Sequence, residues 1–204
     1  MLLKNLENKR NMPKATETLL EIDLNALDNN YKYLTSKLKP NTKVLAVVKA
    51  FAYGSDSVVI AKELVVLGVD YFAVAYANEG ETLRNAFVET PILVLHPLPI
   101  NFDVILNRCL EPSIYSRKML EEFIAFAEVK KQSHYPIHLK FNTGLNRLGF
   151  IDSDVDYIAE TLSKTDSVKV KSVFSHLAAS EDLKLKDFTM GQIEGFRKIS
   201  EVLS

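Results

Sequence analysis

The chain has 204 residues, of which 47% are apolar and 25% are charged, and its formal net charge is −1. These values are typical of a soluble globular protein, and the near-neutral charge gives no electrostatic reason to expect binding to nucleic acid or an anionic membrane. No apolar run approaches the roughly 20 residues that a membrane span requires.

The single cysteine, Cys109, excludes an internal disulfide and indicates a reducing, cytoplasmic setting. Its apolar neighbours predict that it is buried. Residues 1–17 are a polar extension without the apolar centre of a signal peptide, so secretion is not indicated. We expect residues 18–204 to form one domain, because that length can bury a full core.

Strand-like and helix-like segments alternate along the chain. A strand is predicted at 19–22, followed by a helix over 24–38 that Asp23 can cap. Further strands are predicted at 43–48, 71–75, 92–95, 110–115, 135–141 and 168–175, and helices at 56–67, 78–87, 102–107, 116–131, 153–163 and 187–203. Six successive strand–helix units with short links imply a parallel sheet with right-handed crossovers.

Two parallel architectures fit this order: an open doubly wound sheet and a (β/α)8 barrel of the TIM type. No glycine-rich dinucleotide fingerprint follows the first of these strands, which weakens the first architecture. Lys49, Arg147 and His176 follow three different strands, and a barrel gathers such residues at its carboxyl edge. We therefore predict an α/β protein with an incomplete (β/α)8 barrel of about six units, which leaves two open sheet edges.

The apolar run 44–48 ends in Lys49, and Tyr53 and Gly54 follow after a short turn. A buried strand thus delivers one lysine to its carboxyl end, where shielding from water favours the neutral amine, a nucleophile or base. An alternative is that Lys49 simply extends its ammonium group into solvent. Tyr53 could equally be an ordinary half-buried aromatic residue.

Two later segments have the same form, a strand followed by a polar residue. In 138–150, a strand opens into a loop that contains two glycines and Arg147. In 168–182, a strand ends at His176. Each residue has a structural alternative, since an arginine can cap a loop and a histidine can be a packing residue. No histidine has the spacing of a metal ligand.

In combination these segments resemble alanine racemase, the pyridoxal-phosphate enzyme that interconverts L- and D-alanine. The resemblance extends from about residue 18 to the end of the chain. It rests on Val47-Val48-Lys49-Ala50-x-Ala52-Tyr53-Gly54, on Lys140-x-x-Thr143-Gly144-x-x-Arg147-Leu148-Gly149 and on Phe174-Ser175-His176-Leu177-Ala178-x-x-Glu181-Asp182. The fold that it implies, an N-terminal barrel domain, agrees with the predicted architecture.

The resemblance implies a role for each site residue. Lys49 would be the catalytic lysine that holds pyridoxal 5'-phosphate and acts as base on one face of the substrate, and Tyr53 would bind the phosphate. Arg147 would approach the cofactor's phenolic oxygen and the substrate carboxylate. Lys140 matches a lysine that the family often carbamylates to orient this arginine. His176 would support a catalytic tyrosine on the opposite face.

The chain departs from the family pattern at several positions. Asn142 stands where an aspartate is common, which puts the carbamylation of Lys140 in doubt, and Phe51 replaces an aspartate or asparagine. His96 stands where a glycine is expected. His134 and His138 are predicted to be surface or loop residues.

The resemblance also implies alanine as substrate, D-alanine for peptidoglycan synthesis as product use, and a homodimer in the full-length form. The resemblance places the opposite-face tyrosine in a C-terminal β-domain of the partner subunit. We therefore expect these 204 residues alone to lack the second base.

Other interpretations remain open. One is a non-catalytic pyridoxal-phosphate carrier of similar barrel fold and length, which lacks the Arg147 loop. A second is a related barrel enzyme, such as an amino-acid decarboxylase or a D-amino-acid aldolase. A third is a split or truncated product without activity of its own.

Overall fold

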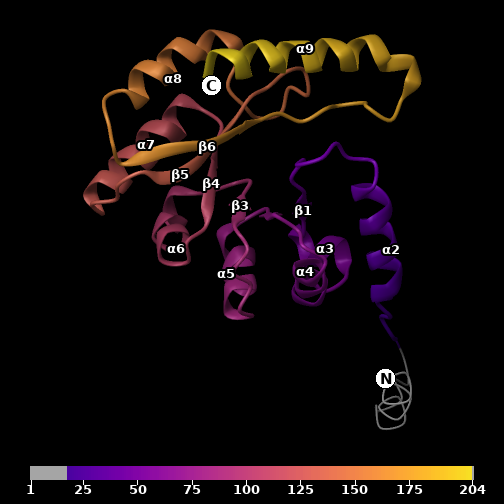
Figure 1. Ribbon diagram of the computed structural model, residues 1–204. Helices are drawn as coiled ribbons and strands as arrows, with labels where there is room; N and C mark the ends of the chain where they lie inside the picture. Colours follow the sequence, from indigo (N-terminus) through magenta and orange to yellow (C-terminus); the bar gives the residue numbers. More distant parts are fainter. Residues whose placement is uncertain (1–17, 204) are drawn as a thin grey trace.

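The computed structural model describes residues 18–203, so the predicted extension 1–17 lies outside the described residues. Within 18–203, six parallel strands pair in the order in which they follow along the chain (Figure 1). They are β1 (Leu45–Val47), β2 (Tyr71–Val74), β3 (Ile92–Val94), β4 (Glu111–Ile114), β5 (Tyr135–Lys140) and β6 (Val168–Phe174). This order is that of a (β/α) barrel, since a doubly wound sheet reverses direction.

Helices precede, connect and follow these strands. They are α2 (Leu24–Thr35), α3 (Lys49–Gly54), α4 (Ser57–Val66), α5 (Ala77–Asn85), α6 (Phe102–Asn107), α7 (Arg117–Val129), α8 (Val155–Leu162) and α9 (Lys186–Leu203), with short 3-10 turns at Pro99–Asn101, Asp152–Asp154 and Leu183–Leu185. Of these, α2 comes before β1 and α9 after β6. The predicted strand–helix alternation is confirmed. So is the cap of α2, because the Asp23 carboxylate accepts hydrogen bonds from the backbone N–H of Asn25 at 2.9 Å and Ala26 at 3.1 Å.

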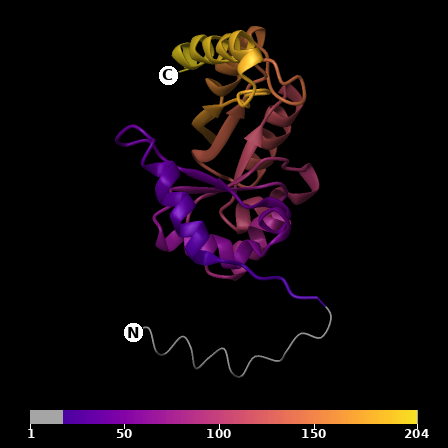
Figure 2. The same cartoon turned by 90° about the vertical axis from the view of Figure 1, so that its right-hand side faces the viewer.

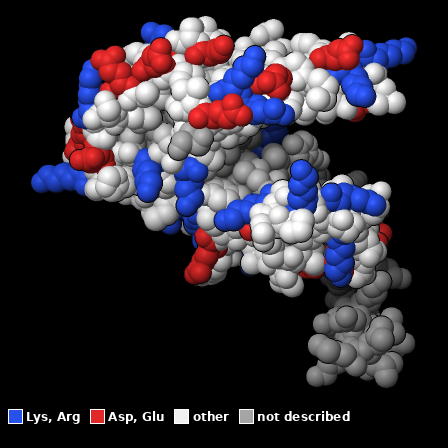
Figure 3. All heavy atoms as spheres, turned by 45° about the horizontal axis from the view of Figure 1, so that its top comes forward, with Lys and Arg blue, Asp and Glu red and all other residues white. Residues whose placement is uncertain are grey.

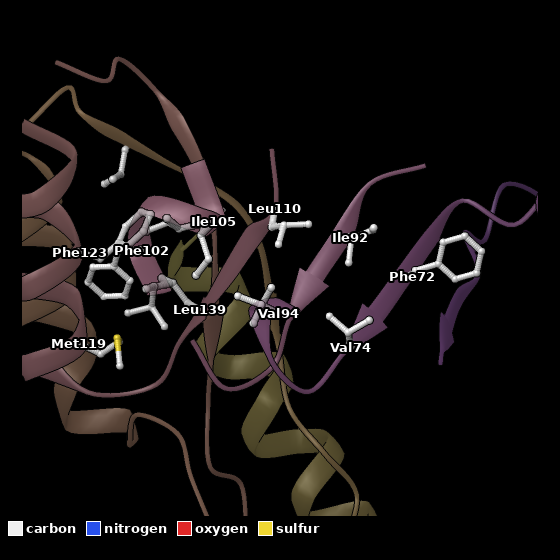
Figure 4. Close-up of a cluster of buried hydrophobic side chains, with 14 of the residues drawn as sticks. Phe72, Val74, Ile92, Val94, Phe102, Ile105, Leu110, Met119, Phe123 and Leu139 are labelled. Atoms are coloured by element: carbon white, nitrogen blue, oxygen red, sulfur yellow. The ribbon is translucent and has the colours of Figure 1, made fainter. Parts of the chain in front are cut away.

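Alternate residues of each strand face opposite sides of the sheet. In β2, Phe72 and Val74 are fully buried in the hydrophobic core, whereas Tyr71 and Ala73 line a cavity on the other face. Figure 4 shows core side chains of β2, β3 and β5, with Leu110 just before β4, beside residues of the covering helices α6 and α7. There the rings of Phe102 (α6) and Phe123 (α7) lie edge to face, with centroids 5.0 Å apart.

The sheet is open between β1 and β6, as predicted, because no pairing joins these two strands within 18–203. Figures 1 and 2 show α2 and α9 well apart, with α9 along the top of both views and α2 below it. Two apolar residues of β1 that face the cavity, Leu45 and Val47, are accordingly exposed. Among residues 18–203, no helix combines the length and the apolar character that a membrane span needs.

Outside the candidate site, two local predictions were wrong. Residues 19–22 form no strand, because no described strand pairs with them, and Leu19 and Leu20 are 66% and 63% exposed. Cys109 is exposed, because it lies in the turn after α6 with a φ of 48° and donates its N–H to the carbonyl of Leu106. Apolar neighbours along the chain do not ensure burial in such a turn, where one side chain can face solvent while its neighbours are buried.

Candidate functional site

A cavity of about 620 Å³ lies on the face of the sheet opposite the helices. It is lined by side chains from all strands but β4, and those at its carboxyl edge include Lys49, Tyr53, Lys140, Arg147 and His176. Figure 3 shows the molecule hollowed between the part that carries α9 and the part that carries α2 to α4, with Lys and Arg side chains beside the hollow. The structure thus brings all the predicted site residues into one cavity.

Lys49 and Tyr53 lie on a left-handed helical turn. Residues 50–53 all have φ between 50° and 61°, and Ala52 donates its N–H to the carbonyl of Val48 at 3.1 Å. This conformation costs L-residues roughly 1–2 kcal/mol each, so the surrounding structure must hold it. As a result Lys49 and Tyr53 face each other, with the Lys49 Nζ 5.9 Å from the centroid of the Tyr53 ring.

Asn142 organises the loop that carries Arg147. Its Oδ1 accepts hydrogen bonds from the N–H of Gly144 at 3.1 Å and of Asn146 at 2.9 Å, and its Nδ2 donates to the Asn146 Oδ1. An asparagine can therefore do the structural work of an aspartate in this loop without adding a negative charge. The loop stays neutral beside Arg147, which is exposed to the cavity.

Gly149 ends the same loop, at a position with no room for a side chain. Its φ is 138°, and a Cβ there would lie 2.5 Å from the Asn142 nitrogen and 2.6 Å from the Phe141 carbonyl carbon. The close approach lets Phe150 donate its N–H to the Lys140 carbonyl while Asn142 donates to the Phe150 carbonyl, both at 2.8 Å. The end of β5 and the Arg147 loop are thereby fixed to each other.

His176 follows β6, and its backbone is held from α9. The side chain of Gln192, 2% exposed, accepts a hydrogen bond from the Ala178 N–H at 3.0 Å and donates one to the His176 carbonyl at 3.4 Å. The nearby Ser175 hydroxyl lies 2.8 Å from the Thr143 hydroxyl and donates to the Phe141 carbonyl. The His176 and Arg147 segments are therefore joined by hydrogen bonds.

The carboxyl edge of the cavity holds three cationic side chains without a compensating carboxylate. No aspartate or glutamate lines the cavity, and Lys49, Lys140 and Arg147 form no ion pair among residues 18–203. Burial, and then the charges of Arg147 and Lys49, hold the pKa of Lys140 below its ordinary value. Burial and the same three cations lower the pKa of His96 and of His176.

Two histidines that the sequence analysis did not assign to the site, His138 and His96, line the cavity. His138, predicted at the surface, is 3% exposed; its Nε2 lies 2.6 Å from a Glu111 carboxylate oxygen and its Nδ1 2.6 Å from the Ser172 hydroxyl. The period of two in β5, which puts residues 138 and 140 on one face, could have found it. His96, noted only as an exception, lines the cavity between the rings of Tyr76 and Tyr115.

These groups fit an anionic ligand with an aldehyde. Uncompensated cations favour a phosphate or carboxylate, and the planar fork of Arg147 can bind either through paired hydrogen bonds. Lys49 supplies a primary amine and Tyr53 a hydroxyl group on the same turn. The donor set therefore matches pyridoxal 5'-phosphate, and no group of three or more potential metal ligands occurs in the described part of the chain.

A parallel sheet in barrel order, with a cationic cavity at its carboxyl edge, defines an α/β-barrel domain suited to an anionic cofactor. The chain belongs to the alanine racemase family, because the family described as "Alanine racemase, N-terminal domain" matches residues 22–204. Members of this family are isomerases that depend on pyridoxal phosphate.

Named relatives support the same assignment. The chain is 34% identical over 187 residues to an alanine racemase of Thermodesulfovibrio yellowstonii, covering 90% of this chain and 49% of that protein. It is 36% identical over 191 residues to alanine racemase 2 of Clostridium acetobutylicum, covering 93% of this chain and 47% of that protein. The chain thus spans about half the length of these curated relatives.

Solved structures agree. An alanine racemase of Clostridium difficile 630 is 28% identical, with a TM-score of 0.87 over 94% of this chain and 50% of that one. An alanine racemase of Bacillus anthracis with bound L-Ala-P is 26% identical, with a TM-score of 0.84 over 94% of this chain and 50% of that one. These comparisons do not favour the non-catalytic carrier.

Replacing Gly149 with alanine should lower the free energy of unfolding by about 2–4 kcal/mol, because the added Cβ collides with backbone atoms and not with a movable side chain. Urea denaturation measures this change. Gly191→Ala in α9 is the matched control, since a Cβ there meets nothing within 4 Å. Equal stability of the two variants would contradict the proposed closure of the Arg147 loop.

Proposed function

We propose that this chain is the barrel half of a pyridoxal-phosphate-dependent alanine racemase, which as a whole protein interconverts L- and D-alanine. The observation that carries the proposal is the convergence of Lys49, Tyr53, Arg147 and His176 on one cavity without a carboxylate. The family match and the half-length relatives support it.

In this proposal each side chain has one task. The Lys49 amine would hold the cofactor through its aldehyde carbon, and the same amine would exchange a proton with the substrate Cα on one face. The Tyr53 hydroxyl donates to the phosphate. Arg147 fixes the substrate carboxylate and the phenolic oxygen. When bound, pyridoxal phosphate withdraws electrons from an attached amino acid and so acidifies its Cα–H bond.

Racemisation needs a second acid or base on the opposite face of the substrate. In the proposal this group is a tyrosine of a C-terminal β-domain, which the partner subunit of a homodimer supplies. His176 is the side chain at this edge that would support it. We further propose a cytoplasmic enzyme whose D-alanine feeds peptidoglycan synthesis; the resemblance to the family supports these points.

Lys140 is proposed to be carbamylated in the working enzyme. It is 5% exposed beside Arg147 and has no anionic partner among residues 18–203. Its lowered pKa enlarges the neutral fraction that attacks carbon dioxide, with release of one proton. The product is an anion that would pair with Arg147. The departure from aspartate at Asn142, which weighed against carbamylation in the sequence, favours it in the folded chain, because a neutral side chain adds no charge that would repel the carbamate.

Bicarbonate at about pH 8.5 should raise the free energy of unfolding of the chain by about 1 kcal/mol, because the carbamate pairs with Arg147 in the folded state only. The response should grow with pH, since a lowered pKa means that the neutral amine appears below the ordinary lysine range. Lys140→Met should abolish the response in urea denaturation. An equal bicarbonate response in both proteins would refute carbamylation.

If Lys49 is a base, the chain should catalyse exchange of the Cα proton of alanine, because this reaction needs an acid/base group on only one face of the substrate. With pyridoxal 5'-phosphate in deuterated water, the chain should exchange the Cα proton of one enantiomer of alanine while inverting little of it, because one acid/base group returns deuterium to the same face. Proton NMR and chiral chromatography of the amino acid measure exchange and inversion separately.

Lys49→Ala should slow this exchange by roughly 100-fold or more, the usual size of a general-base contribution. Lys171→Ala is the control, because Lys171 lines the same cavity but is not at its carboxyl edge. Exchange that survives unchanged in Lys49→Ala would show that free cofactor or another lysine does the work, and the assignment of Lys49 would fail.

A further inference from the structure

The carboxylate of Glu79 joins two neighbouring strand ends at the carboxyl edge. Glu79 is the third residue of α5, which follows β2. One carboxylate oxygen, Oε2, accepts hydrogen bonds from the N–H of Ala75 at 2.6 Å and of Tyr76 at 3.2 Å. The other, Oε1, accepts one from the N–H of Ala50 at 2.8 Å, across 29 residues of sequence.

The first pair of bonds is an ordinary helix cap. A glutamate at the third position of a helix commonly bonds back to the N–H groups that precede it. Such a cap occupies one oxygen and concerns α5 alone. The bond to Ala50 goes beyond a helix cap, because it reaches another element: Ala50 directly follows Lys49 and begins the left-handed turn of residues 50–53.

This turn needs external support. Four consecutive residues with a side chain adopt left-handed values, none of which is glycine, and each of these residues disfavours the conformation. Among the hydrogen bonds of the described residues, the bond from Ala50 to Glu79 is the one that ties the backbone of 49–54 to a side chain. A carboxylate acceptor also makes it stronger than a bond between neutral groups.

The anchor on the other side is rigid. Val48 donates its N–H to the Ala73 carbonyl at 2.9 Å, so the end of β1 runs beside the end of β2. The residues that Glu79 bonds just after β2, Ala75 and Tyr76, therefore sit level with the start of the Lys49 turn. The length of the glutamate side chain spans this separation with both oxygens occupied.

We propose that Glu79 is a positioning residue for Lys49. By bridging the ends of β1 and β2 it holds the left-handed turn and so aims the Lys49 amine and the Tyr53 ring into the cavity. Its importance for catalysis rests on the proposed function, but its effect on the turn does not. Glu79 touches neither substrate nor cofactor in this proposal.

The test compares Glu79→Gln with Glu81→Gln. Glutamine keeps the shape of Glu79, but its amide presents one oxygen and one NH2 group, and the NH2 cannot accept a hydrogen bond. Its single oxygen keeps the larger number of bonds by staying with the N–H groups of Ala75 and Tyr76, so the N–H of Ala50 is expected to lose its acceptor. Glu81, two residues further along α5, is the matched control because it pairs with Arg108 at the surface and not with the Lys49 turn.

Amide hydrogen exchange is the first readout and needs no cofactor. In Glu79→Gln, exchange in a peptide covering 49–55 should accelerate roughly tenfold or more, while peptides from β4 and β5 stay as in the wild type. Glu81→Gln should match the wild type throughout. Unchanged exchange at 49–55, or an acceleration spread evenly over the chain, would overturn the positioning role.

The rate at which pyridoxal 5'-phosphate forms its absorbing adduct is the second readout. Glu79→Gln should slow it about tenfold at a Lys49 that is still present, and Glu81→Gln should not. If the wild type forms no adduct, the proposed function fails while the exchange result still decides the role of Glu79. The wild-type Ala50 amide itself must be protected; if it exchanges at the rate of free amides, the bond to Glu79 does not exist in solution.

Discussion

The gathering of three cationic side chains, Lys49, Lys140 and Arg147, in one cavity is the constraint around which this site is built. No carboxylate lines the cavity, and burial together with the charges of Arg147 and Lys49 holds the pKa of Lys140 below its ordinary value. A chain that only had to fold would gain stability by replacing one of them with an apolar residue. The cluster is understandable if an anionic ligand, or an acquired negative charge on Lys140, supplies the missing compensation.

The fold brings the functional residues together by backbone connections. Lys49 extends from a left-handed turn bonded to Glu79, Arg147 from a loop that Asn142 and Gly149 close, and His176 from a segment bonded by Gln192. Glu79 and Gln192 belong to helices α5 and α9, away from the strands that precede Lys49 and His176. Asn142 and Gly149 belong to the Arg147 loop itself. A site of this kind is preorganised, because the protein's own hydrogen bonds fix its geometry before a ligand binds.

Much of this could be predicted from the sequence, because strict strand–helix alternation with strong apolar periods leaves few topologies. The positions of Lys49, Arg147 and His176 after three strands predicted a shared edge, and the structure places them there. The predictions that were wrong concern single segments or residues whose state depends on tertiary contacts. Residues 19–22 have the composition of a strand but no described partner, and His138 was judged by its neighbours along the chain and not by the face of β5.

The left-handed turn after Lys49 could not have been predicted at all. Local preferences disfavour this conformation at Ala50 and Phe51, and the interaction that supports it comes from Glu79, 29 residues beyond Ala50. The need for Gly149 was likewise hidden, since only the folded backbone shows the atoms that a Cβ would meet. Residues that support a site from a distance are seen only in three dimensions.

The most direct test of the central claim, a cofactor site centred on Lys49, is to find where pyridoxal 5'-phosphate attaches. The purified chain would be titrated with the cofactor, reduced with borohydride, digested and mapped by mass spectrometry. The account predicts a saturable absorbance change and one modified residue, Lys49, at about one label per chain. Labels scattered over surface lysines, or concentrated on Lys140 with Lys49 free, would contradict it.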